Sequence, residues 1–285
     1  MLIACLLFAV AGRVFGADGK KDGKLLEQAL RRDVEFLSDS LCSGRKTGSA
    51  GNSAAAFYII RRLSSLGYEV QFNAFRTGTG AVGRNIVAGH EGGRNAILVM
   101  SAYDGLGTIG GRFYPGADGN ASGVAAMLAL AERLKDRKDI VFAFVDAHNA
   151  NMCGAESLKA YFGRQRLRMV VNLDILGSTM APPDEFWKNY LIVLGGYGYQ
   201  RSLERANEGK SLHLYYNYYG SKSFTDLFYR KVSDHKFFLD KGIPVLMFTS
   251  GITMNTNRET DTAATLDYRV FAQRVELVGS WLENQ

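Results

Sequence analysis

Short apolar runs alternate with amphipathic helical patterns through the middle of the chain. Runs of the buried-strand type occur at 96–103, 140–145 and 169–175. Between the first two, a helical pattern that opens at Asn120 repeats apolar residues at spacings of three and four: Val124, Met127, Leu128, Ala131 and Leu134. Strands that alternate with helices pair in parallel. The sequence therefore predicts an α/β fold, a three-layer sandwich around a mixed, mainly parallel sheet.

The same patterns place the remaining elements. Helices are expected at 24–41, from 54 to a stop at Gly67, at 155–163, at 201–208 and over the last residues through Leu282. Strands are expected at 68–75, 85–88, 190–195, 212–219 and 242–248. The tyrosine-rich run at 212–219 is interpreted as an edge strand with a half-buried aromatic face.

The amino terminus is typical of an export signal. Residues 1–12 are almost entirely apolar but too few to span a membrane, and Val14-Phe15-Gly16 offers a small-residue cleavage site. We therefore predict a signal peptide at 1–16, one domain at 17–285 and a periplasmic or extracellular location. Leu2-Ile-Ala-Cys5 also resembles a lipoprotein processing box, so a start of translation further upstream would make Cys5 a lipid anchor.

Charge and cysteine usage exclude some classes of function. The net charge of +6 is scattered, and its densest patch is interpreted as the solvated face and end of a helix: Lys159, Arg164, Arg166 and Arg168. Nucleic-acid binding is not expected. Cys42 and Cys153 lie in different motifs, and a chain of this size needs no disulfide, so both are expected to be free or buried thiols.

Polar motifs follow the predicted strands, where α/β folds place their ligand sites. They run in this order: Gly44-Arg-Lys-Thr-Gly-Ser49, Tyr103-Asp104, Gly116-Ala-Asp118 with Asn120-Ala-Ser-Gly123, Asn172-Leu-Asp174, Ser233-Asp-His235, Gly242-Ile-Pro244 and Asp261-Thr262. Together they resemble the co-catalytic zinc aminopeptidases, metallopeptidase family twenty-eight, whose relatives include the glutaminyl cyclases. The resemblance covers nearly the whole chain after the signal.

The resemblance implies a pair of zinc ions about 3.5–4 Å apart that activate a water, with a glutamate as general base. At the matching positions, this chain keeps only Asp174 among the metal ligands. The other ligand positions carry residues that cannot replace them: Ala102, Gly119, Asn149 and Asn257. The general-base position is His148. The retained residues that do not bind metal in the family pattern are Asp104, Asp234 and His235.

The replacements are consistent with one another in electrostatic terms. Carboxylates left without their metal ions would repel each other in one pocket and raise their pKa values. Gly119 and Asn149 remove two of them, so the pocket is predicted to be adapted to the absence of metal. Asp104, with Ala102 in place of the histidine it would orient, is expected to cap a turn.

Three functions follow from these residues. The first is an exported pseudopeptidase without zinc or hydrolysis, which binds peptide amino termini near Asp174 and Glu259 or serves an unknown protein partner. The second is a zinc exopeptidase with a rebuilt site, made of Asp174 with His148, Asp104, Asp118 or His235. The third is a thiol nucleophile, Cys153 with His148. No Gly-x-Ser-x-Gly motif supports serine hydrolysis.

Overall fold

The computed structural model describes residues 19–89, 95–162, 167–218, 220–231 and 233–285. Its main feature is an eight-stranded sheet in the order β1-β2-β6-β3-β7-β10-β8-β9. The four central strands β6, β3, β7 and β10 are parallel, while β2 and β8 run antiparallel to their inner neighbours. The mixed, mainly parallel sheet predicted from the sequence is confirmed.

The strands are short, and most of the central ones are buried throughout. Their bounds are β1 Val70–Arg76, β2 Val82–Gly89, β3 Ala96–Ala102, β6 Ile140–Val145, β7 Leu167–Leu173, β8 Tyr190–Leu194, β9 His213–Tyr215 and β10 Val245–Thr249. A separate hairpin pairs β4 Gly107–Ile109 with β5 Arg112–Tyr114. Every residue of β3, β6, β8 and β10 is buried, as expected for strands covered on both faces.

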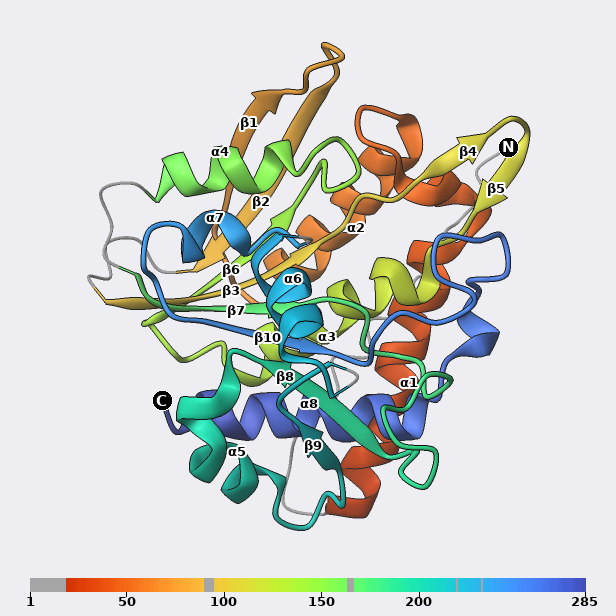
Figure 1. Cartoon of the computed structure of the whole chain (residues 1–285). Coiled ribbons are helices and arrows are strands. Elements are labelled where there is room, and N and C mark those ends of the chain that lie inside the picture. Colours follow the sequence, from red (N-terminus) through yellow and green to blue (C-terminus); the bar gives the residue numbers. More distant parts are fainter. Residues whose placement is uncertain (1–18, 90–94, 163–166, 219, 232) are drawn as a thin grey trace.

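Helices cover both faces of the sheet. Their bounds are α1 Gly19–Ser38, α2 Ala50–Ser65, α3 Gly123–Arg133, α4 Cys153–Tyr161, α5 Gln200–Asn207, α6 Lys222–Lys231, α7 Lys236–Leu239 and α8 Tyr268–Glu283. Apolar residues of α1, α2, α3, α5 and α8 pack on one face, and those of α4 and α7 on the other. Figure 1 shows α4 and α7 on the opposite side of the strands from α8. The three-layer sandwich is confirmed.

Successive side chains of a strand point to opposite faces of the sheet, so one strand contributes to the apolar cores on both faces. In β3, Ile97 and Val99 belong to the larger core with α3, while Leu98 and Met100 belong to the core under α4. This is why residues 96–100 of the run are all apolar: both faces of the strand are covered.

Several predicted boundaries were wrong. α1 ends at Ser38 rather than Leu41, because Asp39 accepts a hydrogen bond from the Leu41 N–H (2.8 Å) and starts a separate short turn. The helix expected from Asn120 begins at Gly123, since the Asn120 side chain is used to join the ends of two strands. The strand expected at 212–219 is only β9, although its edge position is confirmed. The helix α6 was not predicted.

The predicted signal peptide at 1–16, including Cys5, lies outside the described residues. No helix in the described parts of the chain is both long and apolar enough to cross a membrane. Within those parts, Cys42 and Cys153 are free thiols, as expected.

Candidate functional site

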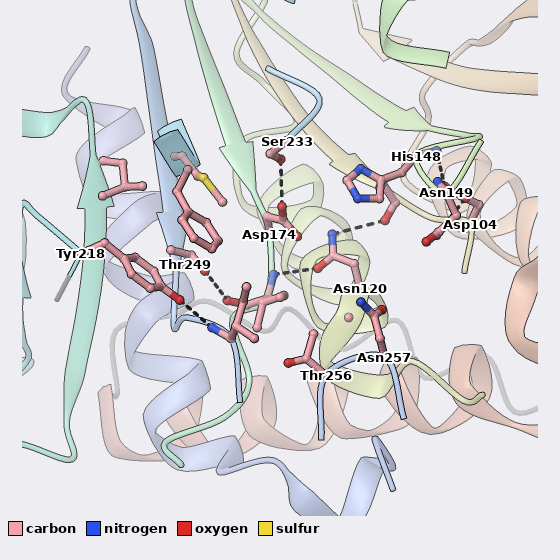
Figure 2. Close-up of a pocket in the computed structure, with 17 residues that line it drawn as sticks. Asp104, Asn120, His148, Asn149, Asp174, Tyr218, Ser233, Thr249, Thr256 and Asn257 are labelled. Atoms are coloured by element: carbon pink, nitrogen blue, oxygen red, sulfur yellow. Dashed lines mark hydrogen bonds between the residues drawn. The ribbon is translucent and has the colours of Figure 1, made fainter. Parts of the chain in front are cut away.

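A pocket lies where the central strands end. The neighbouring strands β6, β3, β7 and β10 are parallel, so the segments after them meet at one edge of the sheet. The cavity has a volume of about 200 Å³. Figure 2 shows the side chains that line it, with His148 and Asn120 on one side and Tyr218 on the other.

The structure brings together the positions that the family resemblance assigned to the zinc site. The lining includes Asp104, the general-base position His148, the retained ligand Asp174, and the four replaced ligand positions Ala102, Gly119, Asn149 and Asn257. These residues come from five separate stretches of sequence. Asp234 lies just behind the pocket, in contact with His148, and His235 is fully buried away from it.

Asp104 holds a neighbouring loop in place. Its carboxylate accepts hydrogen bonds from the backbone N–H groups of His148 (2.8 Å) and Asn149 (3.0 Å), and from the Asn149 side-chain amide (3.1 Å). Burial raises the pKa of Asp104 to about 6, although the His148 charge and the two N–H groups act against that shift. Asp104 therefore caps the loop after β6 rather than a turn of its own segment.

His148 is held as a cation. Its Nδ1 lies 2.9 Å from Oδ2 of Asp234, whose side chain is only 2% exposed, whereas the His148 side chain is 30% exposed. The Asp234 charge raises the pKa of His148 to about 10. Burial acts against this shift, and the hydrogen bond to Asp234 and the charges of Asp174 and Asp104 add to it. The imidazolium thus occupies the position where the family resemblance places a glutamate.

Asp174 follows β7 and is the second charged group of the pocket. Its Oδ2 accepts a hydrogen bond from the Ser233 hydroxyl at 2.8 Å. Burial raises the pKa of its carboxyl group, while the His148 charge and the Ser233 hydrogen bond lower it. The His148 cation and the Ser233 hydroxyl thus favour the carboxylate form of Asp174, against the effect of burial.

His235 and Asp118 do not reach the pocket. Nε2 of His235 lies 2.6 Å from the Tyr229 carbonyl oxygen, and its Nδ1 lies 3.1 Å from Nδ2 of Asn172. Oδ1 of Asp118 accepts from the Gly177 N–H at 2.7 Å. Neither residue lines the cavity. Their placement gives no support to a metal site rebuilt from these two residues around Asp174.

An apolar wall was missed by the sequence reasoning. Tyr218 stacks on Phe228 of α6 with ring centroids 4.9 Å apart, and its hydroxyl oxygen accepts a hydrogen bond from the Ile252 N–H at 2.6 Å. Leu194 and Met247 complete this side. The tyrosine-rich run at 212–219 was the sequence signal for this wall, because α6 carries no motif and Ile252 lies outside the Asp261-Thr262 motif of the loop after β10.

The thiol hypothesis finds no geometric support. The Cys153 thiol donates to the Ala150 carbonyl at 2.8 Å and does not line the cavity. Nδ1 of His148 is directed at Asp234 instead. Glu259, the other expected source of negative charge, forms an exposed ion pair with Arg112, with 3.6 Å between Oε1 and Nη1.

The side chains of the pocket do not fit a pair of zinc ions. Zinc takes imidazole, thiolate or carboxylate ligands, and the two positions at Ala102 and Gly119 offer none. Among the described residues, no three His, Cys, Asp or Glu side chains are grouped so that they could hold a metal ion. The remaining possible ligands in this pocket are Asp104, His148 and Asp174, and each already forms a hydrogen bond or ion pair with a neighbouring protein group.

Comparisons with known proteins agree with this fold. The model of peptidase family M28 matches residues 85–282. The alkaline phosphatase isozyme conversion protein of Escherichia coli is 27% identical over 188 residues, which are 56% of this chain and 53% of that protein. The chain thus spans about half the length of this relative.

Solved structures of low sequence identity share the fold. A zinc aminopeptidase from Bacillus subtilis superimposes with a TM-score of 0.71 at 15% identity, over 90% of this chain and 94% of the other. A glutaminyl cyclase from Bacteroides thetaiotaomicron gives a TM-score of 0.68 at 16% identity, over 91% and 98% of the two chains. Because the family model covers most of the chain, and the sheet and pocket lie where the family resemblance put them, the chain belongs to peptidase family M28.

Proposed function

We propose that this chain is an exported pseudopeptidase, a zinc-aminopeptidase-like protein that binds a ligand without metal and without hydrolysis. The observation that supports the proposal is the composition of the pocket. Ala102, Gly119, Asn149 and Asn257 line the same cavity as Asp174, so the replaced positions have no substitute nearby. Without the bridging carboxylate and both histidines there is no route to a metal-bound hydroxide.

The general base is also replaced by a group of opposite charge. A general base must accept a proton, but the His148 imidazole already holds one because Asp234 stabilises its cation. The proposal includes export from the cytoplasm, and the amino-terminal sequence is the observation that supports it.

A second candidate is a zinc exopeptidase with one rebuilt ion. One contact favours it: histidine ligands of metals commonly donate their other ring N–H to a carboxylate, as His148 does to Asp234. With Asp174, this arrangement would supply two protein ligands, fewer than the three of ordinary catalytic zinc sites.

Metal content decides between the two candidates. The purified mature protein is incubated with excess zinc, desalted and analysed by elemental mass spectrometry, and aminoacyl reporter substrates are then tested with zinc present. The pseudopeptidase predicts far less than one zinc per chain and no release of amino acid. One or more tightly held zinc ions, with hydrolysis abolished in Asp174→Ala, would establish the second candidate.

A restored variant provides a positive control. It combines Ala102→His, Gly119→Asp, His148→Glu, Asn149→Glu and Asn257→His. A side chain at position 119 has room, since its Cβ would lie 3.6 Å from Oδ2 of Asp261, an ordinary contact. Zinc binding by this variant, but not by the wild type, would show that the replaced positions account for the loss.

A further inference from the structure

The two edges of the large sheet differ in length. At one edge β9 has three residues, a length that gives another chain little to pair with. At the other edge β1 has seven residues, and all seven pair with β2 without a register shift. Figure 1 shows β1 and β2 at the margin of the molecule. Among the described residues, no strand pairs with the outer side of β1, so a long edge of the sheet stays open.

The ladder with β2 decides which main-chain groups of β1 point outward. The Thr77 N–H donates to the Ala81 carbonyl oxygen (2.9 Å), one step beyond the opposed residues Arg76 and Val82. Hydrogen-bonded and non-hydrogen-bonded pairs alternate along an antiparallel ladder. Odd-numbered residues of β1 therefore bond to β2, while the even-numbered ones direct their N–H and C=O groups away from the sheet: Val70, Phe72, Ala74 and Arg76. No hydrogen bond from the rest of the described chain reaches these groups.

β1 lacks the features that usually protect an open edge. Natural edge strands avoid pairing through proline, lysine, a bulge or an inward-pointing charge. Residues 70–75 contain no charged residue, no proline and no glycine, and Arg76 stands only at the end of the strand. In the middle of the strand, the Phe72 side chain is 53% exposed. The strand is thus suited to further pairing.

Pairing with a second copy of β1 brings compatible side chains together. A two-fold axis perpendicular to the sheet at Asn73 makes the two strands antiparallel and places Asn73 opposite itself. Phe72 then lies opposite Ala74 of the second copy, and Val70 lies opposite its Arg76. The exposed Phe72 ring thereby gains an apolar neighbour on the same face of the sheet. The strand is complementary to itself in this register.

The charges at the ends of this ladder are also complementary. The two copies of Arg76 lie at opposite ends, about 20 Å apart along the strands, so salt largely screens their repulsion. Each Arg76 lies opposite Val70, whose neighbour in the chain is the exposed Glu69. A basic and an acidic residue therefore come close at both ends, which favours a second copy as the partner.

We infer that the protein forms a two-fold dimer in which β1 pairs antiparallel with β1 of a second copy, centred on Asn73. The new ladder adds about eight main-chain hydrogen bonds, two for each opposed pair of outward-facing residues. No described residue of β1 or β2 lines the pocket. Because the axis reverses the direction of the strands, the two pockets open at opposite ends of the joined sheet, away from the interface.

Analytical ultracentrifugation of the mature protein over a range of concentrations tests the inference. A chelator is present throughout, so that metal ions cannot bridge two chains. One pair of strands lies at the low end of the size range for specific interfaces, so we expect a reversible dimer with a Kd on the order of micromolar. The fraction of dimer should rise with protein concentration across that range.

Two variants with matched controls locate the interface on β1. Ala74→Pro removes an outward N–H but no bond to β2, a position that proline tolerates in an edge strand. It should raise the Kd at least about tenfold, whereas Ala74→Thr, which keeps the N–H, should dimerise as the wild type does. If Ala74→Pro fails to fold, Phe72→Lys decides, because it brings a second positive charge near Arg76 of the second copy. Its control is Phe57→Lys, at a position on α2 that is 66% exposed.

Disulfide cross-linking tests the register. Hydrogen-bonded residues opposite each other in an antiparallel pair have Cα atoms about 5.5 Å apart, which suits a disulfide. An oxidised mixture of Phe72→Cys and Ala74→Cys chains should therefore give a covalent heterodimer. Either variant alone should give none, since equivalent positions lie diagonally, more than about 7 Å apart. The wild type, with its thiols at Cys42 and Cys153, is the control.

Two outcomes would overturn the inference. A wild type that stays monomeric at concentrations far above micromolar would show that β1 does not pair with a second copy. A dimer that neither Ala74→Pro nor Phe72→Lys weakens would place the interface elsewhere on the molecule. Neither outcome affects the measurements of zinc and hydrolysis that test the pseudopeptidase, so a failure of one proposal is distinguishable from a failure of the other.

Discussion

His235 is neutral in the folded protein, and its contacts explain why. The Tyr229 carbonyl oxygen accepts from Nε2–H, which leaves Nδ1 to accept from the Asn172 amide. Burial lowers the pKa of His235 to about 4, against an ordinary value of 6.5. The sequence placed His235 next to a polar site, but only the structure shows that the ring turns into the core. No pattern in a single sequence distinguishes these two orientations.

His235 should make the protein sensitive to acid. Since its pKa is lower in the folded state, its contribution to stability is complete above pH 6.5 and is lost as the pH falls towards 4, by about 3 kcal/mol at most. Urea unfolding at pH 7, 5.5 and 4.5 should give a shallower pH dependence for His235→Gln than for the wild type. His213→Gln is the control. Parallel curves for wild type and His235→Gln would contradict the prediction.

Asp118 should give the unfolding free energy a pH dependence of the opposite sign. Burial and the nearby Asp261 charge raise its pKa to about 7, and Oδ2 has no partner among the described residues. Its protonated form is favoured by folding, so the stability it contributes is complete below pH 3.8 and is lost as the pH rises to about 7. The unfolding free energy of Asp118→Asn minus that of the wild type should therefore increase by about 2–4 kcal/mol from pH 4 to pH 8. Urea unfolding at both pH values measures this difference, with the exposed-site variant Asp226→Asn as a control that should follow the pH dependence of the wild type.

At the scale of elements, Arg45 ties three segments together. Its side chain is fully buried and donates to the carbonyl oxygens of Tyr103 after β3 (2.9 Å), Pro115 (2.8 Å) and Gly116 (2.8 Å), and to that of Leu37 in α1. The sequence showed Arg45 only as part of a glycine-rich loop motif. Its role could not be predicted, because every partner is a backbone group far away in the sequence.

Arg45→Met should therefore destabilise the protein by about 3–5 kcal/mol, since it leaves buried carbonyl groups without donors. Thermal and urea unfolding measure the loss. Lys46→Met, at an exposed neighbouring position, should change the unfolding free energy by less than about 0.5 kcal/mol. An unfolding free energy of Arg45→Met within 1 kcal/mol of wild type would show that the contacts contribute little.

The elements that could be predicted were those with strong periodicity. β3, β6 and α8 are long or fully buried, so their apolar pattern is unambiguous. α6 was missed because Lys222–Lys231 is mostly exposed and follows a tyrosine-rich run that favours a strand. That helix carries Phe228 to the pocket, so the apolar wall was missed with it.

At the scale of the whole molecule, the fold should not depend on metal. The strand ends that surround the pocket are joined by protein groups: Asn120 donates to Ser101 (2.9 Å) and to the Leu173 carbonyl (3.2 Å), and accepts from the Ile175 N–H (2.9 Å). We expect the same unfolding temperature in excess chelator and in excess zinc, measured by calorimetry. A rise of several degrees with zinc, absent in His148→Gln, would reveal a bound ion.

The positions of the site residues were predicted better than their contacts. The family resemblance named seven residues that line one pocket, from Ala102 to Asn257. It could not show that Asp234 supports His148, because that pair is separated by 86 residues and joined only by the fold. Side-chain pairing across a sheet edge depends on loop geometry, which no local pattern encodes.

Two buried arginines hold segments that adjoin the pocket lining through main-chain oxygens. Arg274 donates to the carbonyl oxygens of Tyr190 (2.7 Å), Leu176 (2.7 Å) and Ser178 (2.8 Å), as Arg45 does to those of Tyr103, Pro115 and Gly116. A carbonyl group is present whatever amino acid occupies the position, so these bonds survive substitutions in the loops they hold. Several residues of the cavity lining can therefore change, in evolution or by design, while the segments around them keep these hydrogen bonds.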